Sequence, residues 1–241
     1  MFFSVIDDSC IFFYYVLMKR IFCFAACMAA SFVLSVSAVA QSVMTASDFF
    51  KSVSDYYGTI RDYEADVDIT IGNSSDMQGK ASFKRPEMLR IDFSTPAEQT
   101  IVFSGDTLTI YLPNSTAILQ QSVTSSGAAA ATPEGLSLMR RYYSIAYETG
   151  QDPVPLEQGS SEMVVNLVLK RRSASEAFSQ INLSVDPVTK LIRRVVAITP
   201  ASVSYVFYFS NYRLNTGMSE QRFIYDPPSS ANSYNNFLFS E

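Results

Sequence analysis

Histidine is absent from all 241 residues of this sequence, and cysteine occurs only at Cys10, Cys23 and Cys27. Without histidine, the chain lacks the usual general base, the Ser-His-Asp and Cys-His nucleophile systems, and the commonest metal ligand. Residues 28–241 contain no cysteine, so this part of the chain can form no disulfide and offers no cysteine ligand for zinc or an iron–sulfur cluster. GxSxG, P-loop and dinucleotide-binding glycine patterns are missing as well. We therefore expect a binding protein that is not an enzyme and that uses no metal and no cofactor.

The charge balance is acidic, with 18 Lys and Arg against 23 Asp and Glu and a formal net charge of −5. This excess disfavours nucleic acid as a partner, because phosphates require a basic face. Four carboxylates lie close together at Asp62, Glu64, Asp66 and Asp68, and they alternate with apolar residues such as Val67. The alternation predicts the solvent-facing side of a strand. The alternative is an enzyme that acts on lipid or envelope glycan through these carboxylates.

The first forty residues predict a secretory signal peptide. The basic segment Met18-Lys19-Arg20 precedes an apolar run over 21–36, and the small residues Ala38-Val39-Ala40 stand just before Gln41. This order of basic, apolar and small residues is the one that signal peptidase requires. We therefore expect residues 1–40 to be removed. The mature protein would then be a soluble periplasmic monomer that begins at Gln41 and forms one domain over 41–241.

Three details of this leader leave alternatives open. Residues 1–17 precede the basic segment, so we expect translation to begin at Met18 and the upstream residues to be an extension of the gene model. The leader is alternatively retained as an uncleaved anchor. The segment Phe24-Ala25-Ala26-Cys27 is similar to a lipobox, and acylation of Cys27 would make the protein an anchored lipoprotein.

Hydrophobic patterning of the mature chain predicts a mainly β protein with two helices. A first helix starts near Ser47-Asp48, and a second runs over 134–147 after a flexible connector at 124–134. The predicted strands lie at about 62–72, 77–85, 87–94, 99–104, 107–112, 116–123, 162–172, 178–185, 191–199, 202–214 and 221–226. An antiparallel sheet of about ten or eleven strands must curl. We expect an open, incomplete β-barrel whose mouth is covered by the helices.

Residues 83–113 carry the most specific pattern in the chain. Lys84-Arg85-Pro86 precedes a strand in which Leu89, Ile91 and Phe93 alternate with other residues, and Thr95-Pro96 stops it. A second apolar run, a turn at 104–106, a third run and Pro113 follow. This order of KRP, strand, P, IV, GxxLxxY and P resembles the LolA-type family of periplasmic lipoprotein carriers.

The resemblance implies a carrier that binds the acyl chains of lipoproteins and transfers them from the inner to the outer membrane. Its partners would be acylated lipoproteins, an inner-membrane ABC-type release complex and an outer-membrane acceptor. The helix at 134–147 would be a lid, and Arg85 would hold it closed by hydrogen bonding. Alternatives are a lipid- or lipoprotein-sensing regulatory protein of the same fold and an outer-membrane-anchored acceptor.

Several strands are apolar on both faces, which a filled core and a hollow interior explain equally well. In a hollow interior each enclosed CH₂ of an acyl chain contributes about 0.8 kcal/mol. The side chains that we expect to line it are Leu89, Ile91, Phe93, Ile101, Phe103, Leu136, Met139, Tyr143, Phe207 and Phe209.

Overall fold

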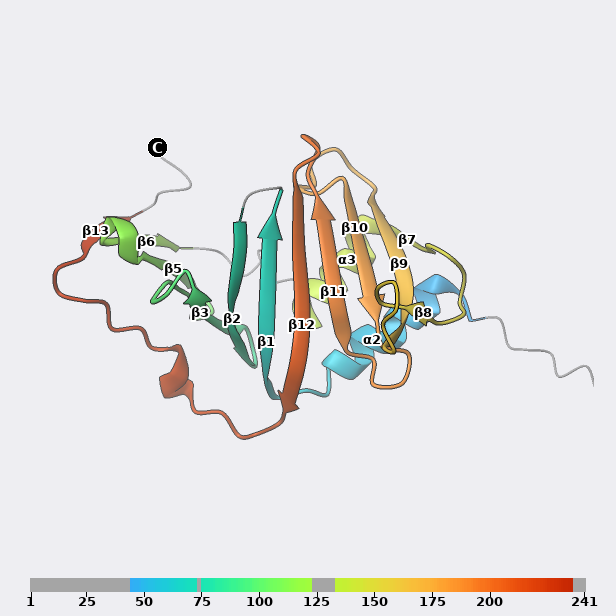
Figure 1. Cartoon of the computed structure of the whole chain (residues 1–241), viewed down its shortest axis with the longest axis horizontal. Coiled ribbons are helices and arrows are strands. Elements are labelled where there is room, and N and C mark those ends of the chain that lie inside the picture. The colour runs from blue at the N-terminus through green and yellow to red at the C-terminus, as the bar shows by residue number, and fades with distance from the viewer. Residues whose placement is uncertain (1–43, 73–74, 123–132, 236–241) are drawn as a thin grey trace, which may run out of the picture. The chain divides into compact units, whose positions relative to one another are not determined.

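The computed structural model describes residues 44–72, 75–122 and 133–235 (Figure 1). The chain divides into two compact units, residues 1–42 and 43–241, and every described residue belongs to the second. The predicted signal peptide and most of the predicted connector lie outside the described residues.

One sheet of thirteen strands forms the second unit, in the order β13-β6-β5-β4-β3-β2-β1-β12-β11-β10-β9-β7, with β8 paired to β9. The first six strands follow the predicted meander and are β1 (Asp62–Ile71), β2 (Ser75–Lys84), β3 (Met88–Thr95), β4 (Thr100–Phe103), β5 (Thr107–Leu112) and β6 (Ala117–Ser122). The remaining seven are β7 (Tyr143–Tyr147), β8 (Val154–Pro155), β9 (Met163–Arg171), β10 (Gln180–Val185), β11 (Ile192–Ile198), β12 (Ser204–Leu214) and β13 (Asn232–Asn235).

The sheet is open, which confirms the predicted fold class. Among the described residues, β13 and β7 stand at the two ends of the strand order and do not pair with each other. All pairs are antiparallel except β13 with β6, where Asn232 lies opposite Ala117 in a parallel register. The expectation of a wholly antiparallel sheet is wrong at this one edge. β12 returns to β1 and so joins the first meander to the second.

Two α-helices pack on one face of the sheet, which we call the inner face. Helix α2 (Ala46–Tyr57) begins at Thr45, whose Oγ1 accepts a hydrogen bond from the Asp48 N–H at 3.1 Å. This start lies slightly before the predicted one. The helix ends at Gly58. Helix α3 (Pro133–Tyr142) contacts α2 and β7. Both helices lie behind β9–β12 in Figure 1.

The hydrophobic core lies between these helices and the inner face. Phe50 and Val53 of α2 and Leu136 of α3 are fully buried, as are Leu167 and Leu183 on the strands beneath them. Each such side chain contributes roughly 1.5–3 kcal/mol to folding. This packing fixes both helices over one half of the sheet.

Two of the predicted elements are wrong, one in its length and one in its type. The second helix ends at Tyr142 rather than at 147, because the Tyr142 carbonyl accepts a hydrogen bond from the Arg172 N–H at 2.9 Å and the chain joins β9 as β7. Residues 221–226 are not a strand. A 3₁₀-helix, η3 (Glu220–Phe223), begins there at Ser219, whose Oγ accepts from the Gln221 N–H at 3.3 Å. A second 3₁₀-helix, η1 (Pro113–Ser115), joins β5 to β6.

The sheet has thirteen strands, whereas about ten or eleven were predicted, because β7 and two further short strands were not expected. Strand β8 lies in the segment predicted as a loop, and β13 lies beyond Pro227-Pro228, where no strand was predicted. Between β12 and β13 runs an extended segment, residues 215–231, which we call the C-terminal strap. It passes from the end of β12 to β6 outside the meander of β2–β5 (Figure 1).

Candidate functional site: an apolar inner face

Apolar side chains line the inner face across neighbouring strands β3 and β4. Leu89 lies opposite Phe103, and Ile91 lies opposite Ile101. The same face continues on β5 and β6, because Ile101 lies opposite Ile110 and Ile110 opposite Leu119. Since strand pairing keeps partners on one side of a sheet, these side chains form a continuous apolar surface. The sequence prediction included four of its members: alternation identified Leu89 and Ile91, and Ile101 and Phe103 came from a run that is apolar on both faces.

The exposure of the inner face changes from one half of the sheet to the other. Leu167 and Leu183 on β9 and β10 are fully buried under the helices. The side chains on β3–β6 are half-buried, and they are Leu89, Ile91, Ile101, Phe103, Leu108, Ile110 and Leu119. Apolar surface that remains partly exposed is what a hydrocarbon ligand requires.

The other predicted lining residues belong to the closed core. Phe93, Phe209, Leu136 and Met139 are buried at 5%, 9%, 0% and 7% exposure, respectively. Phe207 is half-buried and lies opposite Ile69 on the inner face. All of these side chains contact one hydrophobic cluster, so the structure brings the predicted set together while leaving only part of it exposed. Contact with lipid stays a prediction for each of them.

Tyr143 does not lie on the second helix, as predicted, but opens strand β7. Its side chain is buried, and its hydroxyl donates to the Phe178 carbonyl at 3.2 Å. Burial raises the pKa of this phenol, which therefore remains a neutral donor. The helix predicted as a lid is thus the shorter α3, with Leu136 and Met139 as its buried contacts, and its opening stays a prediction.

Arg85 stands at the turn between β2 and β3, and its side chain is exposed. Its guanidinium donates to the carbonyl of Gly58, the residue that ends α2. Carbonyls at a helix C-terminus have no intrahelical partner, so a guanidinium is suited to this position. Among the described residues, the side chain bonds the end of α2 rather than α3. The latch role stays a prediction, with α2 as the element that Arg85 contacts directly.

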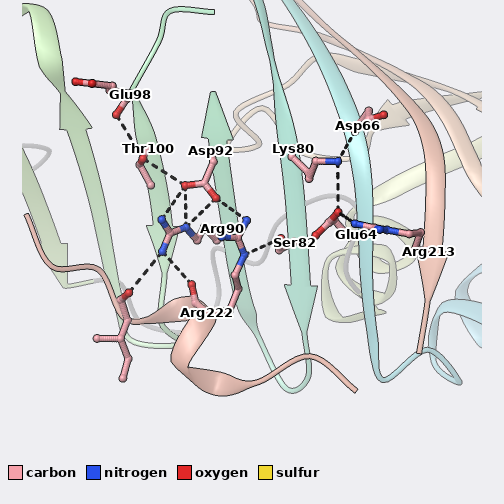
Figure 2. A network of polar contacts seen from close by, with 11 residues as sticks. Glu64, Asp66, Lys80, Ser82, Arg90, Asp92, Glu98, Thr100, Arg213 and Arg222 are labelled. Atoms are coloured by element: carbon pink, nitrogen blue, oxygen red, sulfur yellow. Dashed lines mark hydrogen bonds and ion pairs between the residues drawn. The ribbon is translucent and has the colours of Figure 1, made fainter. Parts of the chain in front are cut away.

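The outer face carries a network of polar contacts (Figure 2). On one side, Lys80 approaches Asp66 at 3.0 Å and Glu64 at 3.4 Å, while Arg213 also bonds Glu64. On the other side, Asp92 accepts hydrogen bonds from Arg90 at 2.9 Å and from Arg222 at 2.6 Å. An outer-face depression of about 760 Å³ lies over this network. Four of its lining charges, Lys80, Asp66, Asp92 and Arg222, belong to these ion pairs, and the exposed carboxylate of Asp68 also lines it.

Glu64 and Asp66, two of the carboxylates considered for catalysis, form hydrogen bonds and ion pairs with neighbouring side chains. Burial raises the pKa of Glu64, but hydrogen bonds from Arg213 and Lys80 outweigh it and hold that pKa below its usual value. Hydrogen bonds from Asn211 and Lys80 lower the pKa of Asp66. A general acid needs a raised pKa, and these two shifts have the opposite sign. The prediction that Asp62 faces solvent is wrong. Its side chain is buried beneath the strap, where its Oδ1 accepts a hydrogen bond from the Thr216 N–H.

In residues 44–72, 75–122 and 133–235, no group of three or more Cys, Asp or Glu side chains is arranged to hold a metal ion. None of the helices in the same ranges is long and apolar enough to cross a membrane.

The fold and the inner face define a helix-covered open sheet, and comparison with known proteins gives its family. The model of the family described as "Outer membrane lipoprotein carrier protein LolA" matches residues 70–226. The chain belongs to the LolA family, which confirms the resemblance predicted from residues 83–113. No curated protein matches the chain.

Several solved structures are similar to this chain at low sequence identity. An uncharacterized conserved protein from Thermus thermophilus superposes with a TM-score of 0.52 at 13% identity, over 77% of this chain and 98% of that chain. A LolA superfamily protein from Nitrosomonas europaea gives 0.40 at 12% identity, over 75% and 98% of the two chains. The lipoprotein LppX from Mycobacterium tuberculosis gives 0.43 at 9% identity, over 72% and 96%.

Proposed function

We propose that this protein is a periplasmic carrier that binds the acyl chains of lipoproteins on its inner face and transfers them from the inner to the outer membrane. The observation that supports this proposal is the row of half-buried apolar side chains on β3–β6, beside a half of the same face that helices cover. Membership of the LolA family adds to it. Binding ten methylenes there would contribute about 8 kcal/mol before the cost of ordering the chain.

The carrier proposal includes partners and a location. Acylated lipoproteins would be the cargo, an inner-membrane ABC-type complex the donor and an outer-membrane protein the acceptor. The predicted signal peptide, residues 1–40, would direct the chain to the periplasm. Mass spectrometry of the protein from cells would then give an N-terminus at Gln41, whereas acylation of Cys27 would point to an anchored acceptor.

The inner face can be tested against the outer face on a single strand. Ile110 faces inward on β5, opposite Ile101, and the preceding residue Thr109 faces outward, opposite Val102. We expect Ile110→Asn to weaken binding of a fluorescent fatty acid by roughly tenfold, because a buried amide without a partner is costly. Thr109→Asn should leave binding unchanged. Asparagine is neutral, so the charge of the fatty acid does not complicate the comparison.

Transfer is the second measurement. The wild-type protein, loaded with a labelled lipoprotein, should pass its cargo to outer-membrane vesicles, and Ile110→Asn should load poorly. Equal fatty acid binding by both variants would exclude the inner face of β5 as the lipid site. Binding without any transfer would favour the sensing alternative over the carrier.

A further inference from the structure

Five basic residues gather at one end of the sheet, and we call them the basic end: Arg140, Arg141, Lys170, Arg171 and Arg172. The first two lie in the last turn of α3, and the other three end β9 and begin the next loop. Strand pairing joins the two groups, because Tyr143, just after α3, lies opposite Arg171. The Arg172 N–H also donates to the Tyr142 carbonyl at 2.9 Å.

Within the described residues, no ion pair neutralises the charge of the basic end, because every ion pair there uses other basic residues. Arg171 donates to the backbone carbonyl of Ala174 at 3.2 Å, and Arg172 donates to that of Tyr143 at 3.1 Å. Glu176 is the one carboxylate in the loop between β9 and β10. A local excess of positive charge therefore stands on a chain whose net charge is −5.

Helix capping explains only part of this cluster. Basic residues in the last turn of a helix interact favourably with its dipole, which accounts for Arg140 and Arg141. It does not account for three more cations brought to the same place by β9. Among the five, all but Arg171 are exposed. Exposed, unpaired cations on long side chains are available for an anionic partner.

Apolar groups are exposed at the same end of the sheet. Tyr142 is 38% exposed, and the Arg141 guanidinium lies 5.4 Å from its ring centroid. Val203 is 39% exposed in the loop between β11 and β12. That loop adjoins the one after Arg172, because the Ser179 hydroxyl donates to the carbonyls of Ile198 at 3.0 Å and Thr199 at 3.2 Å.

We propose that the basic end docks the protein reversibly on an anionic phospholipid surface. Arg140, Arg141 and Arg172 face the lipid phosphates, and Tyr142 lies at the level of the headgroups. Tyrosine next to lysine or arginine is the combination that membrane interfaces favour. An acidic protein would complement the charge alone, and would leave the exposed Tyr142 and Val203 without a role. Docking requires no bound acyl chain, so it goes beyond the carrier proposal.

The test is cosedimentation of the processed protein, as purified from cells, with vesicles of phosphatidylglycerol mixed with phosphatidylcholine, and with vesicles of phosphatidylcholine alone. The double variant Arg140→Gln with Arg141→Gln removes two charges from the basic end. Its matched control, Lys51→Gln with Arg61→Gln, removes two exposed charges elsewhere. Each cation near an anionic surface contributes about fivefold in affinity, so the first variant should bind anionic vesicles roughly 25-fold more weakly.

The control should bind like wild type, and added salt should reduce wild-type binding, because surface charges are screened. Equal loss in both double variants would mean that only net charge matters, and it would overturn the proposal. Wild-type binding that is the same for both kinds of vesicle would also overturn it. Fatty acid binding is measured separately on the same variants. A loss of vesicle docking with normal fatty acid binding supports docking, and failure of fatty acid binding alone concerns only the carrier proposal.

Discussion

Arg222 donates a hydrogen bond to Asp92 at 2.6 Å although 130 positions separate them in the chain. Arg222 lies in the C-terminal strap, and Asp92 lies on the outer face of β3. Arg90 reinforces the contact, because its Nη1 donates to the Arg222 carbonyl at 3.0 Å. Beside them Phe223 is buried, and Tyr225 stacks near Tyr111 with 6.1 Å between ring centroids. The strap is therefore held by both charge and apolar burial.

The strap should detach when its buried anchor is truncated. We expect Phe223→Ala to lower the free energy of unfolding by about 3 kcal/mol, because the buried ring leaves a cavity. The neighbouring Ile224 is 61% exposed, so Ile224→Ala should cost less than about 0.5 kcal/mol. Urea denaturation measures both values. Hydrogen exchange should rise at residues 215–231 in Phe223→Ala alone; uniform loss of protection across α2 and the strap would contradict a local anchor.

Asp62 should make stability depend on acid pH. Burial raises the pKa of this carboxyl, but hydrogen bonds from Thr216, Gly217 and Met218 outweigh it and hold the pKa below its usual value. The unfolded chain, with a pKa of about 3.9 for aspartate, then binds the proton more tightly than the folded chain. The stabilisation is present above that value and is lost as the pH falls through the lower folded pKa.

Asp62→Asn provides the measurement of this effect. Near neutral pH the variant should be less stable than wild type by about 1–3 kcal/mol, because the amide replaces a charged acceptor by a neutral one. Denaturation experiments from about pH 6 down to about pH 2.5 should show the free energies of unfolding of the two proteins converging. A stability difference that stays constant over this range would assign the role of Asp62 to packing instead.

Sequence patterns predicted the strands that have two distinct faces. Leu89, Ile91 and Phe93 alternate clearly, and each end of β3 lies one residue from its predicted position. Tyr143 to Tyr147 fits a helical stripe and a strand equally well, and pairing with β9 decides for the strand. Strand β13 has four exposed residues, and it pairs with β6 across more than a hundred residues of sequence, which no local pattern encodes.

Alternation also predicted which side chains share the inner face, but not which half of that face is covered. Coverage depends on where α2 and α3 pack, and Ile101 and Leu167 look alike as apolar residues within strands. Leu167 is fully buried, whereas Ile101 is half-buried, because both helices lie over the second meander. The strap escaped prediction because its anchors, Asp62 and Asp92, belong to strands far away in the chain.

The buried face of α3 should be required for lipid uptake. Met139 is 7% exposed in the core, whereas Ser137 on the same helix is exposed. We expect Met139→Glu to abolish binding of a fluorescent fatty acid while circular dichroism still shows the sheet, because a carboxylate in an apolar site is costly without a partner. Ser137→Glu adds the same charge on the solvent side and should bind normally. Displacement of the fatty acid as in wild type by Met139→Glu would exclude α3 as the lid.

Arg85 should act on the release of cargo rather than on its uptake. Its guanidinium bonds the Gly58 carbonyl at the end of α2, and α2 packs against α3. Because Arg85 is exposed, we expect the bond to contribute about 1 kcal/mol, or about fivefold in the balance between closed and open forms. Arg85→Leu should fold and load normally but pass its lipoprotein on poorly, since closure no longer helps to expel the acyl chains.

Arg85→Lys tests the geometry of the contact, because it keeps the charge but loses the planar set of donors. We expect it to unload at an intermediate rate in the transfer of a labelled lipoprotein to an outer-membrane acceptor, scored separately for loading and unloading. Arg61→Leu removes an exposed arginine just before β1 and serves as the control. If wild type and Arg85→Leu unload equally, the hydrogen bond to Gly58 serves only to cap α2. The carrier proposal then depends on the inner face alone.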